Sequence, residues 1–243
     1  MISVCLATHN GEKYLTQLID SILPQLNEHD ELIVSDDGSH DATIDILQSY
    51  HDARIHIFHY TQQRDYSQKH LSSFYLASAN FNNALIHAKG DYIFLADQDD
   101  VWLPNKIENC VQLLQKYDII SHNFGIINEK NILLEKQHLS DTIYSKLSLL
   151  GYWRHLPFRG CCLAFNRKVY DISIPIPQDT FEHDCWIGMN AIMRGYKYQY
   201  LAQPLINYRR HSNNVSDIVS SNSLAFKLAY RMKLLKNIIL HQI

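Results

Sequence analysis

The sequence predicts an α/β protein in which a mostly parallel central sheet is flanked by helices and followed by a helical tail. Short apolar runs typical of buried strands recur through the first 120 residues, and amphipathic helical stretches separate them. Polar clusters directly follow three of these runs, at the strand ends where parallel sheets place their binding sites. The 243 residues, 46% of them hydrophobic, suffice for one continuous domain with a sizeable core.

The elements expected in the first half follow from residue type and apolar spacing. Each strand is a short run rich in β-branched or aromatic residues, and each helix has apolar residues at helical spacing. The expected strands are residues 2–7, 32–34, 55–58 and 92–96. The expected helices are residues 12–25, about 41–50, 72–88 and a segment opening at Pro104, a residue favoured in the first helical turn.

After residue 120 the regular alternation of strands and helices stops. The expected elements are a hairpin at 123–134 that turns at 128–131, helices at 142–153 and 184–194, and strands at 160–165, 196–201 and 205–208. We expect one domain, 1–217, and a separate C-terminal segment, 218–243.

Composition excludes several classes of protein. A net charge of −3 does not favour a nucleic-acid binder, so no nucleic-acid partner is expected. Five cysteines, an odd number without a CxxC pair, favour the reduced thiols of a cytosolic protein over a disulfide framework or a zinc site. No apolar stretch approaches ~18 residues and no signal peptide is visible, so no membrane span is expected.

The small net charge hides an asymmetry along the chain. Residues 1–120 carry a net charge of −10 and residues 121–243 a net charge of +7. An acidic and a basic half on one chain raise the question of what binds between them.

The strongest chemical signal is Asp97-Gln98-Asp99-Asp100, directly after an expected strand. Carboxylates this close repel one another unless a proton or a cation relieves them, and hard oxygen ligands favour Mg²⁺ or Mn²⁺. Asp97 and Asp99 are the expected metal pair. The alternative is that Asp99 or Asp100 caps the following helix, which explains one aspartate but not three.

Two further polar clusters follow the first and second strands. Asp36, in the run 36–39, can accept a hydrogen bond from a base or a ribose; the alternative is an Asx-type turn. The run 8–11, which contains Thr8 and Asn10, has neither the GxGxxG nor the P-loop spacing. The absence of the GxGxxG spacing counts against a dehydrogenase, and the absence of the P-loop spacing counts against an ATPase.

Two clusters in the second half carry candidate chemistry. Asp184 opens an expected helix and is either a cap or a general base. Arg209 and Arg210 suit a diphosphate, and His211 can complete a metal shell; the alternative is a solvated basic loop.

Together these stretches resemble glycosyltransferase family 2, whose fold is the Rossmann-like GT-A fold. The resemblance is carried, in order and spacing, by residues 3–15, 35–39, 90–102, 160–167 and 208–211. Within the family the sequence is most similar to the bacterial branch that contains rhamnosyltransferases and other enzymes of O-antigen and capsule biosynthesis.

The resemblance implies an inverting, metal-dependent hexosyltransferase that uses a UDP- or dTDP-sugar. Residues 1–120 would form the nucleotide- and metal-binding half, and residues 121–217 the acceptor-binding half. The implied roles are donor nucleotide binding by Thr8, Asn10, Glu12, Asp36 and Asp97; metal binding of Mg²⁺ or Mn²⁺ by Asp97, Asp99 and His211; diphosphate binding by Arg209 and Arg210; and general base catalysis by Asp184. The sequence departs from the family pattern at His9, where Tyr is usual, and at His183, where Glu is common.

The implied acceptor is a glycan or a lipid-linked oligosaccharide, at the cytoplasmic side of the cell membrane. The tail supports this partner, because residues 220–240 combine basic residues with an apolar stripe of Leu224, Leu228, Met232, Leu235 and Ile239. The helix could instead dock on the domain or on a second subunit. Two other functions remain open: a sugar nucleotidyltransferase, which lacks its glycine-rich phosphate loop here, and a non-catalytic carbohydrate-binding protein on a transferase fold.

Overall fold

The computed structural model of the chain describes residues 1–62, 69–137, 147–212, 214 and 223–241. Within them the strands are β1 Ile2–Thr8, β2 Glu31–Asp36, β3 Ile55–His59, β4 Tyr92–Asp97, β5 Val101–Trp102, β6 Ile119–Asn128, β7 Leu133–Glu135, β8 Leu163–Asn166 and β9 Tyr198–Arg210. The α-helices are α1 Leu15–Ile22, α2 Thr43–Ser49, α3 Lys69–Leu85, α4 Lys106–Leu114, α5 Leu149–His155, α6 Arg167–Ser173, α7 His183–Met193 and α8 Leu224–Leu240. Short 3₁₀ turns, η1 Leu23–Gln25 and η4 Gly160–Cys162, precede β2 and β8.

The nine described strands form one mixed sheet in the order β3-β2-β1-β4-β8-β6-β9-β5, with β7 paired to β6. Strands β3, β2, β1 and β4 are parallel neighbours, so the carboxyl ends of β1, β2 and β4 meet at one edge. In register, Thr8 lies beside Asp36 and Ala7 beside Asp97. The polar residues that follow these strands are thereby brought together.

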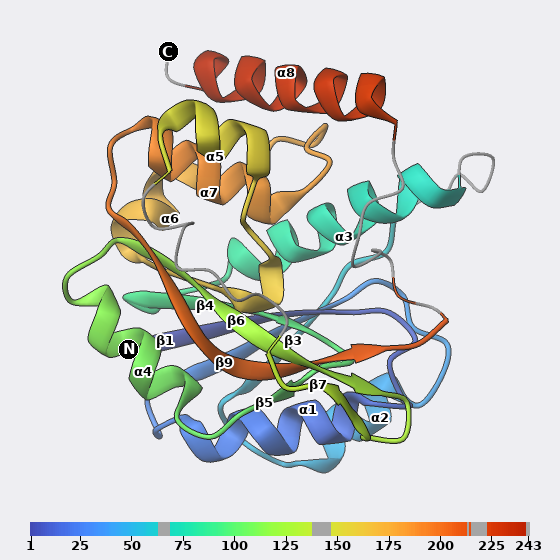
Figure 1. Cartoon of the computed structure of the whole chain (residues 1–243). Helices are drawn as coiled ribbons and strands as arrows, with labels where there is room; N and C mark the ends of the chain where they lie inside the picture. The colour runs from blue at the N-terminus through green and yellow to red at the C-terminus, as the bar shows by residue number, and fades with distance from the viewer. Residues whose placement is uncertain (63–68, 138–146, 213, 215–222, 242–243) are drawn as a thin grey trace.

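Two hydrophobic cores cover the two faces of the sheet (Figure 1). On one face, helices α1, α2 and α4 bury their apolar stripes against the sheet. On the other, α3, α6 and α7 pack on the sheet, and α5 and α8 add an outer layer (Figure 1). The start of α7 and one side of α8 form part of the wall of the cavity described below.

The structure confirms the α/β class and the mostly parallel sheet, with differences in the second half. The hairpin expected at 123–134 forms between β6 and β7. Strand β8 runs antiparallel between β4 and β6, and β9 is one strand with register shifts, where two short strands were expected. Helix α6 was not predicted. Residues 142–146 of the expected helix and the boundary at 217 lie outside the described residues.

Helix α8 docks on the domain, but through the face opposite the stripe singled out in the sequence. Leu234 and Ile238 are buried against the second core. Arg231 donates from Nε to the carbonyl oxygen of Trp153 at 3.1 Å, which ties α8 to the end of α5. Most of the predicted stripe faces outward: Leu224, Leu228, Met232 and Ile239 are exposed, and Leu235 is half-buried. Among the described residues, no helix combines the length and apolar character needed to cross a membrane.

All five cysteines are buried free thiols. This agrees with the odd count and the lack of a CxxC pair in the sequence.

Candidate active site

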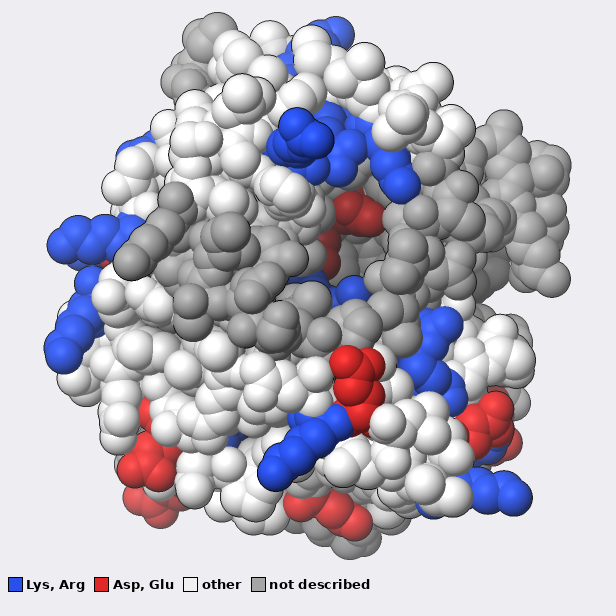
Figure 2. Space-filling model, in the orientation of Figure 1, with Lys and Arg blue, Asp and Glu red and all other residues white. Residues whose placement is uncertain are grey.

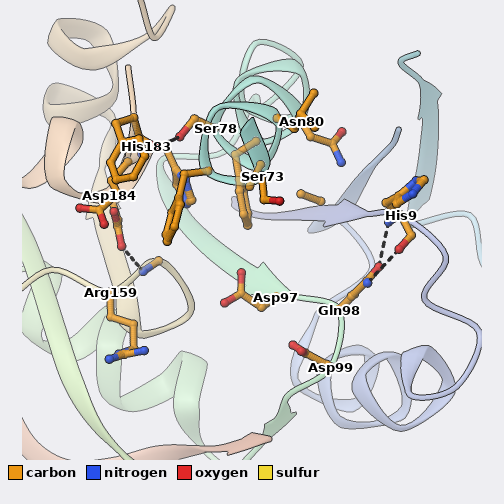
Figure 3. Close-up of a pocket in the computed structure, with 18 of the residues that line it drawn as sticks. His9, Ser73, Ser78, Asn80, Asp97, Gln98, Asp99, Arg159, His183 and Asp184 are labelled. Atoms are coloured by element: carbon orange, nitrogen blue, oxygen red, sulfur yellow. Dashed lines mark hydrogen bonds between the residues drawn. The ribbon is translucent and has the colours of Figure 1, made fainter. Parts of the chain in front are cut away.

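A cavity of about 790 Å³ opens at the carboxyl ends of β1 and β4. Its walls come from the loop after β1, the N-terminal half of α3, the turn before η4, the start of α7 and one side of α8. Acidic atoms lie inside the hollow, and Lys and Arg atoms gather along its upper rim (Figure 2). Asp97, Asp99, Arg159 and Asp184 surround the same space in Figure 3. The cavity therefore combines carboxylates with a cationic rim.

The loop after β1 is held against β4 by the amide of Gln98. Its Oε1 accepts from the backbone N–H of His9 at 2.9 Å, and its Nε2 donates to the carbonyl oxygen of His9 at 3.1 Å (Figure 3). A Cβ at Gly11 would lie 2.5 Å from Oε1 of Gln98, so a larger residue at this position would displace the Gln98 amide. Gln98 thus fixes the loop that carries Thr8 and Asn10.

Of the five residues expected to bind the donor nucleotide, Thr8, Asn10 and Asp97 line the cavity. Asp36 is 1% exposed and lies behind them, where it accepts a hydrogen bond from Oγ1 of Thr8 at 2.9 Å. Glu12 is exposed outside the cavity lining and accepts from the backbone N–H of Ala42 at 3.0 Å. In this structure Asp36 and Glu12 order the loops around the cavity.

The floor of the cavity carries Asp97, the last residue of β4. Burial raises the pKa of Asp97 to about 7, and the charges of Asp99 and Asp184 add to the rise. The guanidinium of Arg159 opposes the shift; it lies over the rings of Phe124 and Tyr208, 4.9 and 5.2 Å from their centres. Negative charge is therefore crowded on the floor and only partly compensated by protein groups.

Asp99 lies beside Asp97 at the cavity edge and is paired with His211. Oδ2 of Asp99 is 2.7 Å from Nε2 of His211 and accepts from Nδ2 of Asn214 at 3.1 Å. The imidazole in turn stacks on Tyr14 at 5.1 Å between ring centres. The structure thus brings together Asp97, Asp99 and His211, the three residues expected to hold a metal.

The carboxylates of Asp97 and Asp99 offer the hard oxygen donors that a divalent cation such as Mg²⁺ or Mn²⁺ prefers. Asp97 and Asp99 supply oxygen ligands facing the cavity, and a cation would relieve the repulsion that raises the pKa of Asp97. Among the described residues, two groups of possible ligands have their ligand atoms within 4.8 Å of one another: Asp97, Asp100 and Cys161, and Glu182, Asp184 and Cys185. Neither group contains Asp99 or His211. Asp100 and Cys161 are fully buried and do not line the cavity, whereas Asp99 does.

Arg209 does not lie where a diphosphate could reach it, which corrects the sequence-based expectation. It is fully buried, and its guanidinium lies 4.5 Å from the ring centre of Tyr14. The side chain donates to Gln17 at 2.7 Å and to the carbonyl oxygen of Asp99 at 2.7 Å, and its backbone N–H donates to Asp100 at 3.0 Å. Arg209 joins α1, β9 and the loop after β4. Arg210 does not line the cavity either.

The cation that does face the floor is Arg159, which the sequence analysis missed. It precedes η4, at the beginning of the run Gly160–Cys162 that carries the family resemblance. The position of Arg159 immediately before that run could have marked it as a candidate site residue. The sequence alone does not show on which side of the sheet its side chain projects.

The start of α7 contributes two carboxylates, Glu182 and Asp184, both in the cavity lining. Oδ2 of Asp184 accepts from the backbone N–H of Gly160 at 2.9 Å (Figure 3), and Oδ1 accepts from that of Cys185 at 2.7 Å. Burial raises the pKa of Glu182, and the charge of Asp184 adds to the rise. Sequence analysis named Asp184 and missed Glu182.

Helix α8 closes the cavity opposite the acidic floor. Four of its residues line the cavity: Phe226, Lys227, Tyr230 and Arg231. The sequence suggested a tail separate from the domain, because an amphipathic pattern does not reveal what a helix packs against. In the structure this tail is part of the site.

The family model described as glycosyl transferase family 2 matches residues 3–172. The putative teichuronic acid biosynthesis glycosyltransferase TuaG of Bacillus subtilis is 31% identical over 220 residues, which cover 89% of this chain and 81% of TuaG. WfaP of Escherichia coli, named a UDP-Glc:alpha-D-GlcNAc-diphosphoundecaprenol beta-1,3-glucosyltransferase, is 26% identical over 222 residues, covering 89% of this chain and 80% of WfaP.

Solved structures share the fold at low sequence identity. S. aureus TarS 1-349 in complex with UDP-GlcNAc has a TM-score of 0.70 at 17% identity, with 99% of this chain and 66% of that chain covered. The mannosyltransferase PcManGT of Pyrobaculum calidifontis, in complex with GDP-Man and Mn²⁺, has a TM-score of 0.57 at 18% identity, with 84% and 54% covered. Since the family model covers most of the chain and the fold agrees, the protein belongs to glycosyltransferase family 2 and has the GT-A fold.

Proposed function

We propose that the protein is an inverting, metal-dependent hexosyltransferase that moves a sugar from a UDP- or dTDP-sugar to a hydroxyl group of its acceptor. One observation carries the proposal: the carboxylates at the end of β4 face those at the start of α7 across a single cavity. The first set suits a metal-bound diphosphate and the second suits a general base.

The nucleotide would lie against the loop after β1. Thr8 and Asn10 line that side of the cavity, and Asp36 and Glu12 order the surrounding loops from behind. TarS, which shares the fold, is named in complex with UDP-GlcNAc, and this supports a uridine nucleotide. The base pocket would then extend from His9 toward Asp37, whose carbonyl oxygen lies 2.7 Å from Nδ1 of His9.

The diphosphate would lie over Asp97 and Asp99. A Mg²⁺ or Mn²⁺ ion bound there, with His211 beside it, would supply Lewis-acid stabilisation of the leaving diphosphate. Arg159 adds a positive charge from the opposite wall, where the sequence had nominated Arg209 and Arg210. A carboxylate at the start of α7, where the sequence nominates Asp184, accepts the proton of the acceptor hydroxyl as its oxygen attacks the anomeric carbon from the face opposite the diphosphate.

The acceptor would be a glycan or a lipid-linked oligosaccharide in the biosynthesis of a bacterial surface polysaccharide such as O-antigen or capsule. TuaG and WfaP, named for teichuronic acid biosynthesis and for a diphosphoundecaprenol substrate, support this class. The outward stripe of α8 supports action at the cytoplasmic face of the membrane, since Leu224, Leu228 and Met232 are exposed beside basic residues.

A screen of UDP-, dTDP- and GDP-sugars tests the proposal by measuring release of nucleoside diphosphate. At least one donor should be turned over with Mn²⁺ or Mg²⁺, and EDTA should abolish the reaction reversibly. Formation of pyrophosphate with a nucleoside triphosphate and a sugar phosphate would instead indicate a sugar nucleotidyltransferase. Glycan binding without release of nucleoside diphosphate from any donor would indicate a non-catalytic carbohydrate-binding protein.

A further inference from the structure

We infer that Glu182 accepts the proton of the acceptor hydroxyl and that Tyr230 of helix α8 is the residue that positions Glu182. The inference rests on the proposed function, because it assigns roles within the same site. It also gives the C-terminal helix a part in the reaction. Glu182 and Asp184 stand two residues apart at the start of α7, so their surroundings decide between them.

The carboxylate of Asp184 accepts hydrogen bonds from the backbone. Its two carboxylate oxygens accept one backbone N–H each, from Gly160 at 2.9 Å and from Cys185 at 2.7 Å. These bonds join the turn before β8 to the first turn of α7. Both carboxylate oxygens of Asp184 are thus already engaged by the backbone, whereas an incoming acceptor hydroxyl needs an unoccupied acceptor position. Asp184 is therefore better placed to fix the architecture than to take a proton.

The surroundings of Glu182 are different. Its hydrogen bonds gather on one oxygen: Oε2 accepts from Oη of Tyr230 at 2.6 Å and from Sγ of Cys185 at 3.2 Å. No recorded hydrogen bond within the described residues occupies Oε1, and the residue lines the cavity. Burial and the charge of Asp184 raise the pKa of Glu182, which brings the group closer to the value that suits a base near neutral pH.

Packing of α8 against the domain fixes the position of Tyr230 relative to Glu182. Its ring packs on Phe181 at 5.3 Å between centres, and the buried residues Leu234 and Ile238 anchor the next turns of α8 on the domain. The charged and titratable groups near Glu182 come from three elements: Asp184 and Cys185 on α7, Arg159 before η4, and Tyr230 on α8. Lys227 and Arg231 of α8 line the same cavity.

The step balances without another reactant. The O–H bond of the acceptor breaks and its proton goes to the carboxylate of Glu182. The acceptor oxygen forms the new bond to the anomeric carbon, and the bond from that carbon to the diphosphate oxygen breaks with its electron pair on the nucleotide. The protonated Glu182 then returns its proton to solvent after the products leave.

The pH dependence of a Tyr230→Phe variant tests this assignment. The hydroxyl of Tyr230 lowers the pKa of Glu182, so its removal should raise that pKa. The acidic limb of the pH profile for nucleoside diphosphate release, measured with water as acceptor and at saturating Mn²⁺, should move up by roughly half to one pH unit. Tyr75→Phe is the matched control, because Tyr75 also packs on Phe181 but does not line the cavity.

A second pair of variants removes each carboxylate in turn. Glu182→Gln should lower kcat by roughly 10²- to 10⁴-fold while the affinity for UDP with Mn²⁺ stays unchanged. Asp184→Asn should instead lower the melting temperature, since two backbone N–H groups lose their acceptor oxygens. An unmoved acidic limb in folded Tyr230→Phe, or normal turnover in Glu182→Gln, overturns the inference. Wild-type protein inactive with every sugar nucleotide would overturn the proposed function instead.

Discussion

Three aspartates within four residues have three different surroundings. Asp97 lies on the cavity floor with a raised pKa, and Asp99 is paired with His211 at the edge. Asp100 is fully buried and accepts a hydrogen bond from the backbone N–H of Arg209. The cluster was found in the sequence because of its charge density. Which of the three aspartates faces the cavity and which is buried depends on contacts with β9, which lies more than 100 residues away in the sequence.

The substitution Asp99→Asn should abolish both metal binding and turnover while leaving the fold intact. Asp99 is partly exposed at the cavity edge, so the loss of its charge removes a metal ligand without opening the core. Thermal stabilisation by Mn²⁺ with UDP measures the binding. Asp171→Asn, an exposed position on α6, is the control and should retain the full response. A variant at Asp99 that still binds Mn²⁺ normally would remove this residue from the metal site.

Metal affinity should depend steeply on pH around neutrality. Since the pKa of Asp97 is raised to about 7, a proton competes with the cation below that pH and the carboxylate is available above it. Mn²⁺ titrations should therefore show affinity falling about tenfold per pH unit below pH 7 and levelling above it. An affinity that is constant from pH 6 to 8 would contradict this placement of Asp97.

The sequence does not show which of the two arginines, Arg209 or Arg159, faces the cavity. The sequence nominated Arg209 for the diphosphate and did not consider Arg159, although the guanidinium of either residue suits a phosphate chemically. In the structure Arg209 lies within β9, and Arg159 directly precedes η4. Strand alternation sends Arg209 inward against Tyr14, whereas Arg159 projects into the cavity. The β9 register that decides this contains shifts near Asn123 that no sequence pattern reveals.

At the scale of elements, the first half could be predicted well because local patterns determine it. Strands β1 to β4 and the helices between them form near their expected positions, since parallel strands joined by helices leave little choice of partner. The second half depends on long-range pairing instead. The antiparallel insertion of β8 between β4 and β6 follows from contacts that local spacing cannot encode.

Helix α8 has apolar residues on both faces, and its stability should depend on only one of them. Ile238→Ala removes a fully buried side chain and should destabilise the protein by about 2–5 kcal/mol. Met232→Ala changes an exposed position and should alter the free energy of unfolding by less than about 0.5 kcal/mol. Chemical denaturation of both variants provides the comparison. Equal effects would mean that the helix packs differently.

The outward face of α8 should instead govern binding to lipid. A double substitution of Leu228→Glu and Met232→Glu places two charges on exposed apolar positions and should abolish co-sedimentation with vesicles containing anionic phospholipid. Because neither residue is buried, the melting temperature should change little. Unchanged sedimentation of the variant, or a dimer of the wild type that the variant disrupts, would point to a second copy of the chain as the partner of this face.

At the scale of the whole molecule, the charge asymmetry of the sequence has a counterpart in the cavity. The first half supplies Asp97 and Asp99, and the second half supplies Arg159, Lys227 and Arg231 together with the carboxylates Glu182 and Asp184. The two halves therefore meet across one space, although the cationic residues there are different from those first expected. Much of the remaining charge lies on the surface, away from the hollow (Figure 2).

The central claim is that a metal held by Asp97 and Asp99 binds the diphosphate of the donor in this cavity. The most direct measurement is anomalous scattering from Mn²⁺ in crystals grown with UDP. We expect a Mn²⁺ peak in contact with the carboxylates of Asp97 and Asp99, with the diphosphate on the cation and the uracil against the loop after β1. A UDP molecule bound elsewhere, or bound here with Mn²⁺ on other residues, would contradict it.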